Sequence, residues 1–381
     1  MPGSLRVARI LGIDIRVHFS WILIFLLITF SLASEVLPTG WSEVKQLAVA
    51  AFAALLFFAS LLAHELAHAL VARASGMTVS SITLFLLGGV ANLTTEPRSA
   101  LAELAMAVSG PLTSFALAGV AYLVQQTAAG LLDPVIADTI TPVAGYLTFV
   151  NLAVGVFNLV PGFPLDGGRV LRSIIWAIRG DRAKATAIAA RGGQIVAVAI
   201  GLLGLLVLLV LGDGFGLWYL LIAWFLFGMA SASIAQERIQ AAAAGVRVSQ
   251  LMTSEPRTAR PEMSAAELVR DVMLPFNIAV VPVVSGGRLL GTVGLDELAG
   301  IDESARPLIG VAQVMIPAER VATVTPQDDL IVAIERLGDG ALLPVLRDGV
   351  LVGALYRDTV SSYLRMRTAL GRASATAPHG A

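Results

Sequence analysis

Long apolar runs alternate with short polar segments over the first 235 residues of the chain. A run of about twenty apolar residues is long enough to cross the hydrocarbon core of a bilayer as a helix. Six runs approach or exceed this length, at residues 17–34, 46–72, 101–126, 142–161, 194–211 and 217–235. The pattern therefore predicts a polytopic α-helical membrane protein with about six transmembrane helices.

Basic residues gather on alternate sides of these runs. Arg6, Arg9 and Arg16 precede the first run, whereas the loop expected around residues 127–141 contains no Lys or Arg. The loop expected after the fourth run is basic again, with Arg169, Arg172, Arg179, Arg182, Lys184 and Arg191. Because cytoplasmic loops carry an excess of Lys and Arg, we expect a multi-pass protein of the cell membrane with both termini in the cytoplasm.

The segment before the third run, and three residues within that run, depart from the pattern of apolar spans. Residues 77–93 are too few to span a bilayer and are rich in Thr, Val, Ile and Leu, a composition typical of strands. Within the third run, Gly110 and Pro111 are expected to serve helix packing. Glu103, near the cytoplasmic end of that run, is expected to be solvated.

The tail from about residue 246 is less apolar and repeats itself. A V-x-x-x-M motif begins at Val248 and again at Val311, and each copy is followed by a [VL]-P-V strand and a glycine, Gly291 or Gly353. The offset of about sixty residues predicts two small α/β units packed together. This tail resembles a tandem CBS-domain module.

These shifts in composition and the duplication divide the chain. We expect a transmembrane domain over residues 1–240, a first CBS repeat over 246–304, a second CBS repeat over 309–368 and a disordered tail over 369–381. The expected fold is thus a helical membrane domain followed by a cytoplasmic α/β module.

The composition narrows the chemistry. Hydrophobic residues make up 56% of the chain and charged residues only 14%, which excludes a wholly soluble or disordered protein. The net charge of −1 gives no reason to expect a nucleic-acid partner. With no Cys and only four His, a metal site must be built from histidine and carboxylate side chains.

The second apolar run contains the sequence H-E-L-A-H at residues 64–68. His64 and His68 are four residues apart, so both imidazoles lie on one helix face and can reach one metal ion, with Glu65 beside them. The alternative is a pair of hydrogen-bonded core histidines and a glutamate that reaches the membrane surface. Ionisable residues within membrane helices are costly and usually functional, which favours the metal site.

A zinc site needs a third protein ligand. Asp166 is the candidate, because it follows a span broken by Pro161, Gly162 and Pro164, and because His18 and His379 are poorly placed. The alternative is an ordinary helix end, with Asp166 in a turn. Charge alternation places His68 and Asp166 at a similar depth near the cytoplasmic face, which supports the ligand interpretation.

The two motifs together resemble the site-2 protease family of intramembrane zinc metalloproteases. The resemblance rests on H-E-x-x-H at 64–68 and on F-N-L-x-P-x-x-P-L-D-G-G-R at 157–169. It extends to the segments 88–91 and 110–113, although Ser114 stands where many members have Asn. Six spans with a cytoplasmic CBS pair are an arrangement of the microbial branch of this family.

The resemblance implies roles for several residues. His64, His68 and Asp166 would hold one Zn²⁺ per chain, and Glu65 would be the general base. Asn158 would orient the substrate or stabilise the oxyanion, although a helix–helix hydrogen bond is an equal alternative. Residues 77–93 would form a membrane-associated hairpin that pairs with an unwound substrate, with a partly buried loop as the alternative.

CBS pairs often bind adenine nucleotides in the cleft between their repeats. The ribose-binding pattern G-h-h-[ST]-x-x-D is incomplete here, because both repeats lack the hydroxyl residue and Asp296 and Asp358 lie one position early. Homodimerisation or gating of the cytoplasmic entrance is an equal alternative to nucleotide binding.

The function expected is that of an intramembrane zinc metalloendopeptidase. Its partner would be a transmembrane protein substrate, such as a membrane-bound transcriptional regulator cleaved in regulated intramembrane proteolysis. The alternative is a CBS-regulated transporter or channel whose His, Glu and Asp residues line an ion path.

Overall fold

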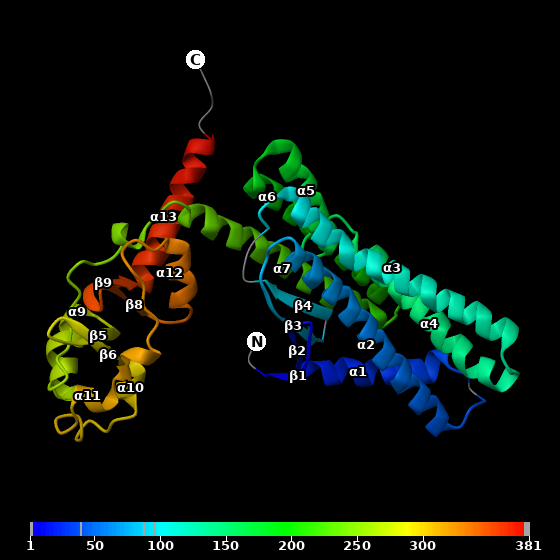
Figure 1. Cartoon of the computed structure of the whole chain (residues 1–381), viewed down its shortest axis with the longest axis horizontal. Helices are drawn as coiled ribbons and strands as arrows, with labels where there is room; N and C mark the ends of the chain where they lie inside the picture. Colours follow the sequence, from blue (N-terminus) through cyan, green and yellow to red (C-terminus); the bar gives the residue numbers. More distant parts are fainter. Residues whose placement is uncertain (1–2, 39, 87, 94–96, 377–381) are drawn as a thin grey trace, which may run out of the picture. The chain divides into compact units, whose positions relative to one another are not determined.

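A computed structural model describes residues 3–38, 40–86, 88–93 and 97–376 of the chain (Figure 1). The chain divides into two compact units, Met1–Ala235 and Gln236–Ala381. We describe each unit separately.

The first unit contains a four-stranded sheet in the order β1-β2-β3-β4. Strands β1 (Ser4–Ile10) and β2 (Ile13–His18) precede the first apolar helix, and β3 (Val79–Phe85) and β4 (Gly88–Leu93) form the hairpin that follows the second. Strands β2 and β3 are parallel neighbours. The strand character of residues 77–93 is confirmed, whereas β1 and β2 were not predicted in the basic segment that precedes the first apolar run.

Apolar side chains join this sheet to the helix that follows. Ile13, Ile15 and Ile82 are buried in one cluster with Ala69 and Ala72 of α2. The small alanines let the helix lie close to the sheet. The carboxyl-terminal end of α2 is therefore attached to β2 and β3.

Helices make up the rest of the first unit. Helix α1 (Ser20–Ser31) continues into a π-helical turn, Leu32–Val36, and α2 covers Glu43–Ala74 with Ser42 as its cap. The remaining helices are α3 (Ala100–Leu131), α4 (Pro134–Asn158), α5 (Asp166–Arg179), α6 (Arg182–Leu209) and α7 (Phe215–Ala243), and the residues of α7 from Gln236 onward belong to the second unit.

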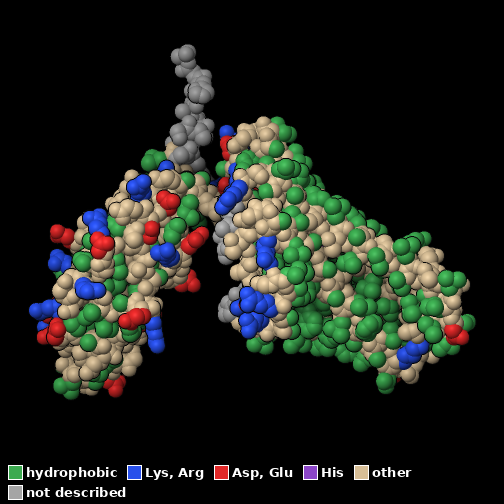
Figure 2. Space-filling model, in the orientation of Figure 1, with side chains coloured by type: hydrophobic (Ala, Val, Ile, Leu, Met, Phe, Trp, Pro, Cys, Tyr) green, Lys and Arg blue, Asp and Glu red, His purple; other side chains and the backbone are tan. Residues whose placement is uncertain are grey.

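Within the described ranges, five helices are long and apolar enough to cross a membrane, and the first apolar run forms a shorter helix. The five are α2, α3, α4, α6 and α7. Figure 2 shows that hydrophobic side chains cover much of the visible surface of this unit. The six predicted spans therefore correspond to five long helices and one short one.

Two predicted loops are helical instead. The loop expected around residues 127–141 is confined to the junction between α3, which ends at Leu131, and α4, which begins at Pro134. The basic loop expected after the fourth run contains α5, whose side chains include Arg169 and Arg172. Asp133 caps α4 by accepting a hydrogen bond from the N–H of Val135. Only Leu132 and Asp133 therefore separate α3 from α4.

The predicted break after the fourth span is present between α4 and α5. The loop passes close to α6, and the N–H of Phe163 donates a hydrogen bond to the carbonyl of Ala189 at 3.2 Å. A Cβ on Gly193 would lie 2.9 Å from the backbone nitrogen of Phe163, so only glycine allows this approach. The loop is thereby held against α6 and delivers Asp166 as the first residue of α5.

The second unit contains a sheet in the order β5-β6-β9-β8, with β7 paired to β6. The strands are β5 (Val280–Ser285), β6 (Arg288–Gly294), β7 (Ile316–Pro317), β8 (Leu342–Arg347) and β9 (Val350–Tyr356). The helices are α8 (Ala265–Glu267), α9 (Leu274–Phe276), α10 (Leu295–Ala299), α11 (Val311–Val314), α12 (Leu330–Leu337) and α13 (Arg357–Thr376). The tail predicted to be disordered overlaps α13 up to Thr376, and residues 377–381 lie outside the described residues.

The two repeats exchange their leading segments. Val248 is buried in a cluster with Leu343 and Leu355, which belong to the strands of the second repeat. A Cβ on Gly353 would lie 2.8 Å from the sulfur of Met252, so that methionine packs directly on the glycine. A Cβ on Gly291 would likewise lie 3.2 Å from the sulfur of Met315, so the methionine of each copy packs on the glycine of the other.

Candidate active site

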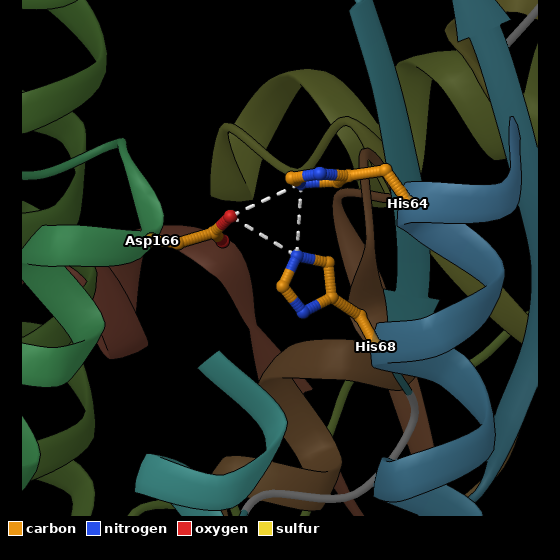
Figure 3. A group of neighbouring side chains, drawn as sticks. All are labelled: His64, His68 and Asp166. Atoms are coloured by element: carbon orange, nitrogen blue, oxygen red, sulfur yellow. Dashed lines mark hydrogen bonds and ion pairs between the residues drawn. The ribbon is translucent and has the colours of Figure 1, made fainter. Parts of the chain in front are cut away.

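His64 and His68 point from one face of α2 toward Asp166 at the start of α5 (Figure 3). The Nε2 atoms of the two histidines lie 3.2 Å apart. Asp166 Oδ2 lies 3.2 Å from His64 Nε2 and 3.0 Å from His68 Nε2. Both histidines are buried. The structure therefore brings together the three residues that the sequence predicted as metal ligands.

The three atoms fit the face of a tetrahedral zinc site. Ligands about 2.0–2.1 Å from zinc in a tetrahedral arrangement lie about 3.3–3.4 Å from one another, close to the separations of 3.0–3.2 Å found here. Within the described ranges, this is the group of His and carboxylate side chains that could hold a metal ion.

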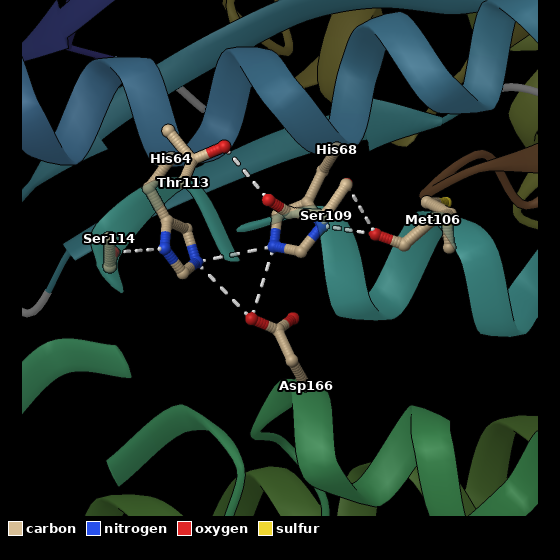
Figure 4. A network of polar contacts seen from close by, with 7 residues as sticks. All are labelled: His64, His68, Met106, Ser109, Thr113, Ser114 and Asp166. Atoms are coloured by element: carbon tan, nitrogen blue, oxygen red, sulfur yellow. Dashed lines mark hydrogen bonds and ion pairs between the residues drawn. The ribbon is translucent and has the colours of Figure 1, made fainter. Parts of the chain in front are cut away.

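The other ring nitrogens of the histidines are held by α3 (Figure 4). His68 Nδ1 lies 2.7 Å from the carbonyl oxygen of Met106, which can only accept a hydrogen bond. His68 therefore donates through Nδ1, and in the neutral ring Nε2 keeps its lone pair for a metal. His64 Nδ1 lies 2.9 Å from the hydroxyl of Ser114, which gives the second ring a matching support.

Gly110 of α3 lies directly against both imidazoles. A Cβ at this position would be 2.5 Å from His68 Cε1 and 2.6 Å from His64 Nε2. Gly110 was expected to serve helix packing, and the neighbours that it packs against are the two imidazoles of the candidate site. The sequence shows a glycine within a long apolar helix, but it does not show which side chains that glycine contacts.

Glu65 lies next to His64 on α2 and turns toward strand β4. A Cβ on Gly89 would be 2.5 Å from Glu65 Cγ and 3.1 Å from Glu65 Oε1. The side chain is partly buried. This strand, the last in the sheet order, therefore packs against the candidate base through a glycine.

The two asparagines of α4 differ. Asn151 is buried, and its Nδ2 donates to the carbonyl of Leu147 in its own helix at 2.8 Å, which is typical of a structural residue. Asn158 is the last residue of α4 and is partly buried. Among the described residues it has no hydrogen-bond partner for its side chain, so the helix–helix hydrogen bond considered for it is not present there.

The remaining histidines lie elsewhere. His18 Nδ1 lies 2.8 Å from the hydroxyl of Ser20, at the junction of β2 and α1. His379 lies outside the described residues. Neither joins the group of His64, His68 and Asp166.

Glu103 corrects another expectation. It is fully buried rather than solvated, and its Oε1 accepts a hydrogen bond from Nε of Arg172 at 2.7 Å. The pair joins α3 to the middle of α5, the helix whose first residue is Asp166. Burial was not foreseeable from the sequence because the partner is 69 residues away.

Comparison with known proteins decides the family. The model of peptidase family M50 matches residues 52–135 and 127–202, and the CBS domain model matches residues 248–303. The zinc metalloprotease Rip3 of Mycobacterium tuberculosis is 37% identical over 340 residues, which cover 88% of this chain and 86% of the relative. The chain belongs to peptidase family M50.

Further relatives of this M50 protein come from other organisms. The zinc metalloprotease MJ0392 of Methanocaldococcus jannaschii is 28% identical over 94% of this chain and 96% of its own length. The solved site-2 protease from Methanocaldococcus jannaschii is 31% identical and covers 61% of this chain and 95% of its own, with a TM-score of 0.43.

The resemblance to the site-2 proteases is confirmed. The M50 protein is a zinc metalloprotease, hence a hydrolase that acts on proteins, and a multi-pass membrane protein with a C-terminal CBS domain. Family membership favours this activity over the transporter considered from the sequence.

Proposed function

We propose that the M50 protein hydrolyses peptide bonds within or near transmembrane segments of other membrane proteins, with His64, His68 and Asp166 as zinc ligands and Glu65 as general base. The observation that carries this proposal is the convergence of one carboxylate oxygen with two buried imidazole nitrogens of the long apolar helix α2. Polar groups of this kind are rare at such positions unless they serve a function.

One Zn²⁺ per chain would be held by these three residues, and when bound it supplies Lewis-acid chemistry that polarises a carbonyl and activates water. Glu65 accepts the proton of the attacking water and later donates it to the amine nitrogen that leaves. Met106 and Ser114 hold the two imidazoles by their far nitrogens, so the ligand atoms are oriented before the substrate arrives.

The substrate must be extended where it is cut, because a helix shields its own peptide bonds. Strand β4 stands last in the sheet order and pairs with β3 on one side. An extended peptide that added to its other edge would pass Gly89 and therefore Glu65. We propose that β4 positions the scissile segment by strand addition, with Asn158 as a donor to the substrate or the oxyanion.

The arrangement of the sheet supports the proposed topology. Helices α1 and α2 connect β2 to β3, which are neighbours in one sheet, so this pair of apolar helices begins and ends on the same side. The basic residues near that side, among them Arg73 and Arg98, favour the cytoplasm. We therefore propose that the protein lies in the cell membrane with both termini cytoplasmic.

The biological context is also a proposal. A membrane-bound transcriptional regulator remains the proposed substrate, cleaved in regulated intramembrane proteolysis. The CBS pair would regulate cleavage through an adenine nucleotide, through homodimerisation or by gating the entrance. The repeats are proposed to cover residues 246–304 and 309–368.

The proposal is tested with the purified full-length protein in liposomes that contain a model single-span substrate. We expect about one zinc per chain and cleavage that is lost in Glu65→Gln while the zinc is retained. Cleavage by Glu65→Gln at the wild-type rate would reject the assigned base, and zinc-free protein with full activity would reject the metal site.

A further inference from the structure

Arg172 of α5 connects three parts of the active-site region. Its guanidinium binds Glu103 of α3 through Nε at 2.7 Å, and Nη2 contacts the same carboxylate oxygen. It also lies 4.9 Å from the centre of the Phe163 ring, in the loop that precedes Asp166. Arg172, which follows Asp166 on α5, therefore contacts the loop that precedes Asp166 and links α5 to α3.

This ion pair is buried to an unusual degree for charged side chains. The side chain of Glu103 is 0% exposed and that of Arg172 is 11% exposed. Glu103 Oε2 is also buried and has no hydrogen-bond partner among the described residues. A buried pair of this kind often stabilises a protein no more than well-packed apolar residues would. Stability alone is therefore a weak explanation for it.

The position of Glu103 on α3 suggests what the pair does instead. Glu103, Met106, Gly110 and Ser114 are spaced by three or four residues and share one face of the helix. The last three lie against the histidine rings. The same helix face thus holds the imidazoles and, through Glu103, the helix that begins with Asp166.

We propose that Glu103 and Arg172 are positioning residues that set the place of the Asp166 carboxylate relative to the two histidines, and thereby the affinity of the site for its metal. Hydrogen bonds between charged groups are directional, whereas an apolar contact between α3 and α5 would tolerate sliding. The inference rests on the proposed ligand set of His64, His68 and Asp166.

The test measures zinc affinity of the full-length protein by competition with a chelator. Glu103→Gln keeps the size of the side chain but removes its charge, and we expect zinc to bind about 10- to 100-fold more weakly. Asp181→Asn is the matched control, because it removes the carboxylate of an exposed ion pair with Lys184 and should leave zinc affinity unchanged. Wild-type zinc affinity in Glu103→Gln would overturn the proposal.

A double variant separates positioning from stability. Glu103→Met combined with Arg172→Met removes both charges, so the zinc-free protein should unfold at a higher temperature than the Glu103→Met single variant. We expect zinc affinity to stay about 10-fold or more below that of the wild type. Recovery of zinc affinity together with stability would overturn the proposal. If the double variant does not fold, Glu103→Asp decides, because it keeps the charge and shortens the reach, with the same weakening expected.

The outcomes also separate this inference from the proposed function. If the wild type binds zinc and Asp166→Ala loses it, the ligand set stands, and the Glu103 variants judge the positioning role alone. If Asp166→Ala retains zinc at wild-type affinity, the ligand set fails and the positioning role fails with it.

Discussion

The backbone of Gly110 lies so close to His68 that a Cβ on the glycine would be 2.5 Å from Cε1 of the imidazole. No real Cβ contact is this short, so a side chain here would displace the ring or move α3 away from α2. We therefore infer that this glycine shapes the proposed metal site.

Gly110→Ala is expected to weaken zinc binding about 100-fold or more and to abolish cleavage. Gly119→Ala on the same helix is the control, because nothing lies within 4 Å of its Cβ and alanine favours the helix. Zinc content and cleavage of the two purified variants are compared. Equal zinc content in both variants would show that the approach of Gly110 does not shape the site.

Ser114→Ala removes the hydroxyl that lies 2.9 Å from His64 Nδ1. The ring then loses the contact that orients it, and zinc affinity or activity should fall about 10- to 100-fold. Thr113→Val is the matched control, because the Thr113 hydroxyl donates only to the carbonyl of Ser109 in its own helix. The prediction fails if both variants change zinc affinity by the same factor.

Gly89→Ala places a methyl group 3.1 Å from Oε1 of Glu65. Because the contact involves the proposed base and not the ligands, cleavage should fall by about 10-fold or more while zinc content stays at the wild-type level. The measurement is kcat in liposomes beside zinc content per chain. Loss of zinc from this variant would place Gly89 among the supports of the metal site instead.

Gly193→Ala tests the loop that leads to Asp166. Its Cβ would lie 2.9 Å from the nitrogen of Phe163, so the loop must shift, at a cost of about 1–3 kcal/mol in unfolding free energy. We expect weaker zinc binding as well, because Asp166 follows this loop. Gly201→Ala, whose Cβ would be 3.4 Å from Ala223, should change neither quantity. Unchanged zinc affinity in Gly193→Ala would separate the loop from the site.

The sequence predicted the parts of the site that depend on local geometry. His64 and His68 share a face because a helix repeats every 3.6 residues, and the absence of Cys left a carboxylate as the third ligand. The prolines around Gly162 indicated the break that precedes Asp166. Each of these inferences needed only neighbouring residues or the composition.

The parts that depend on distant partners were not predictable in the same way. Strands β1 and β2 are short and carry arginines, so they did not stand out from a basic flank. Glu103 near a span end is typical of a solvated residue, and its burial depends on Arg172 of another helix. Met252 and Gly353 are far apart in the sequence, so their packing was visible only in the structure.

The most direct test of the account is the zinc content of the purified full-length protein and of its Asp166→Ala variant, with Asp181→Asn as control. The account predicts about one zinc per chain in the wild type and in Asp181→Asn, and loss of zinc together with cleavage in Asp166→Ala. Zinc retained at the wild-type level in Asp166→Ala would contradict it.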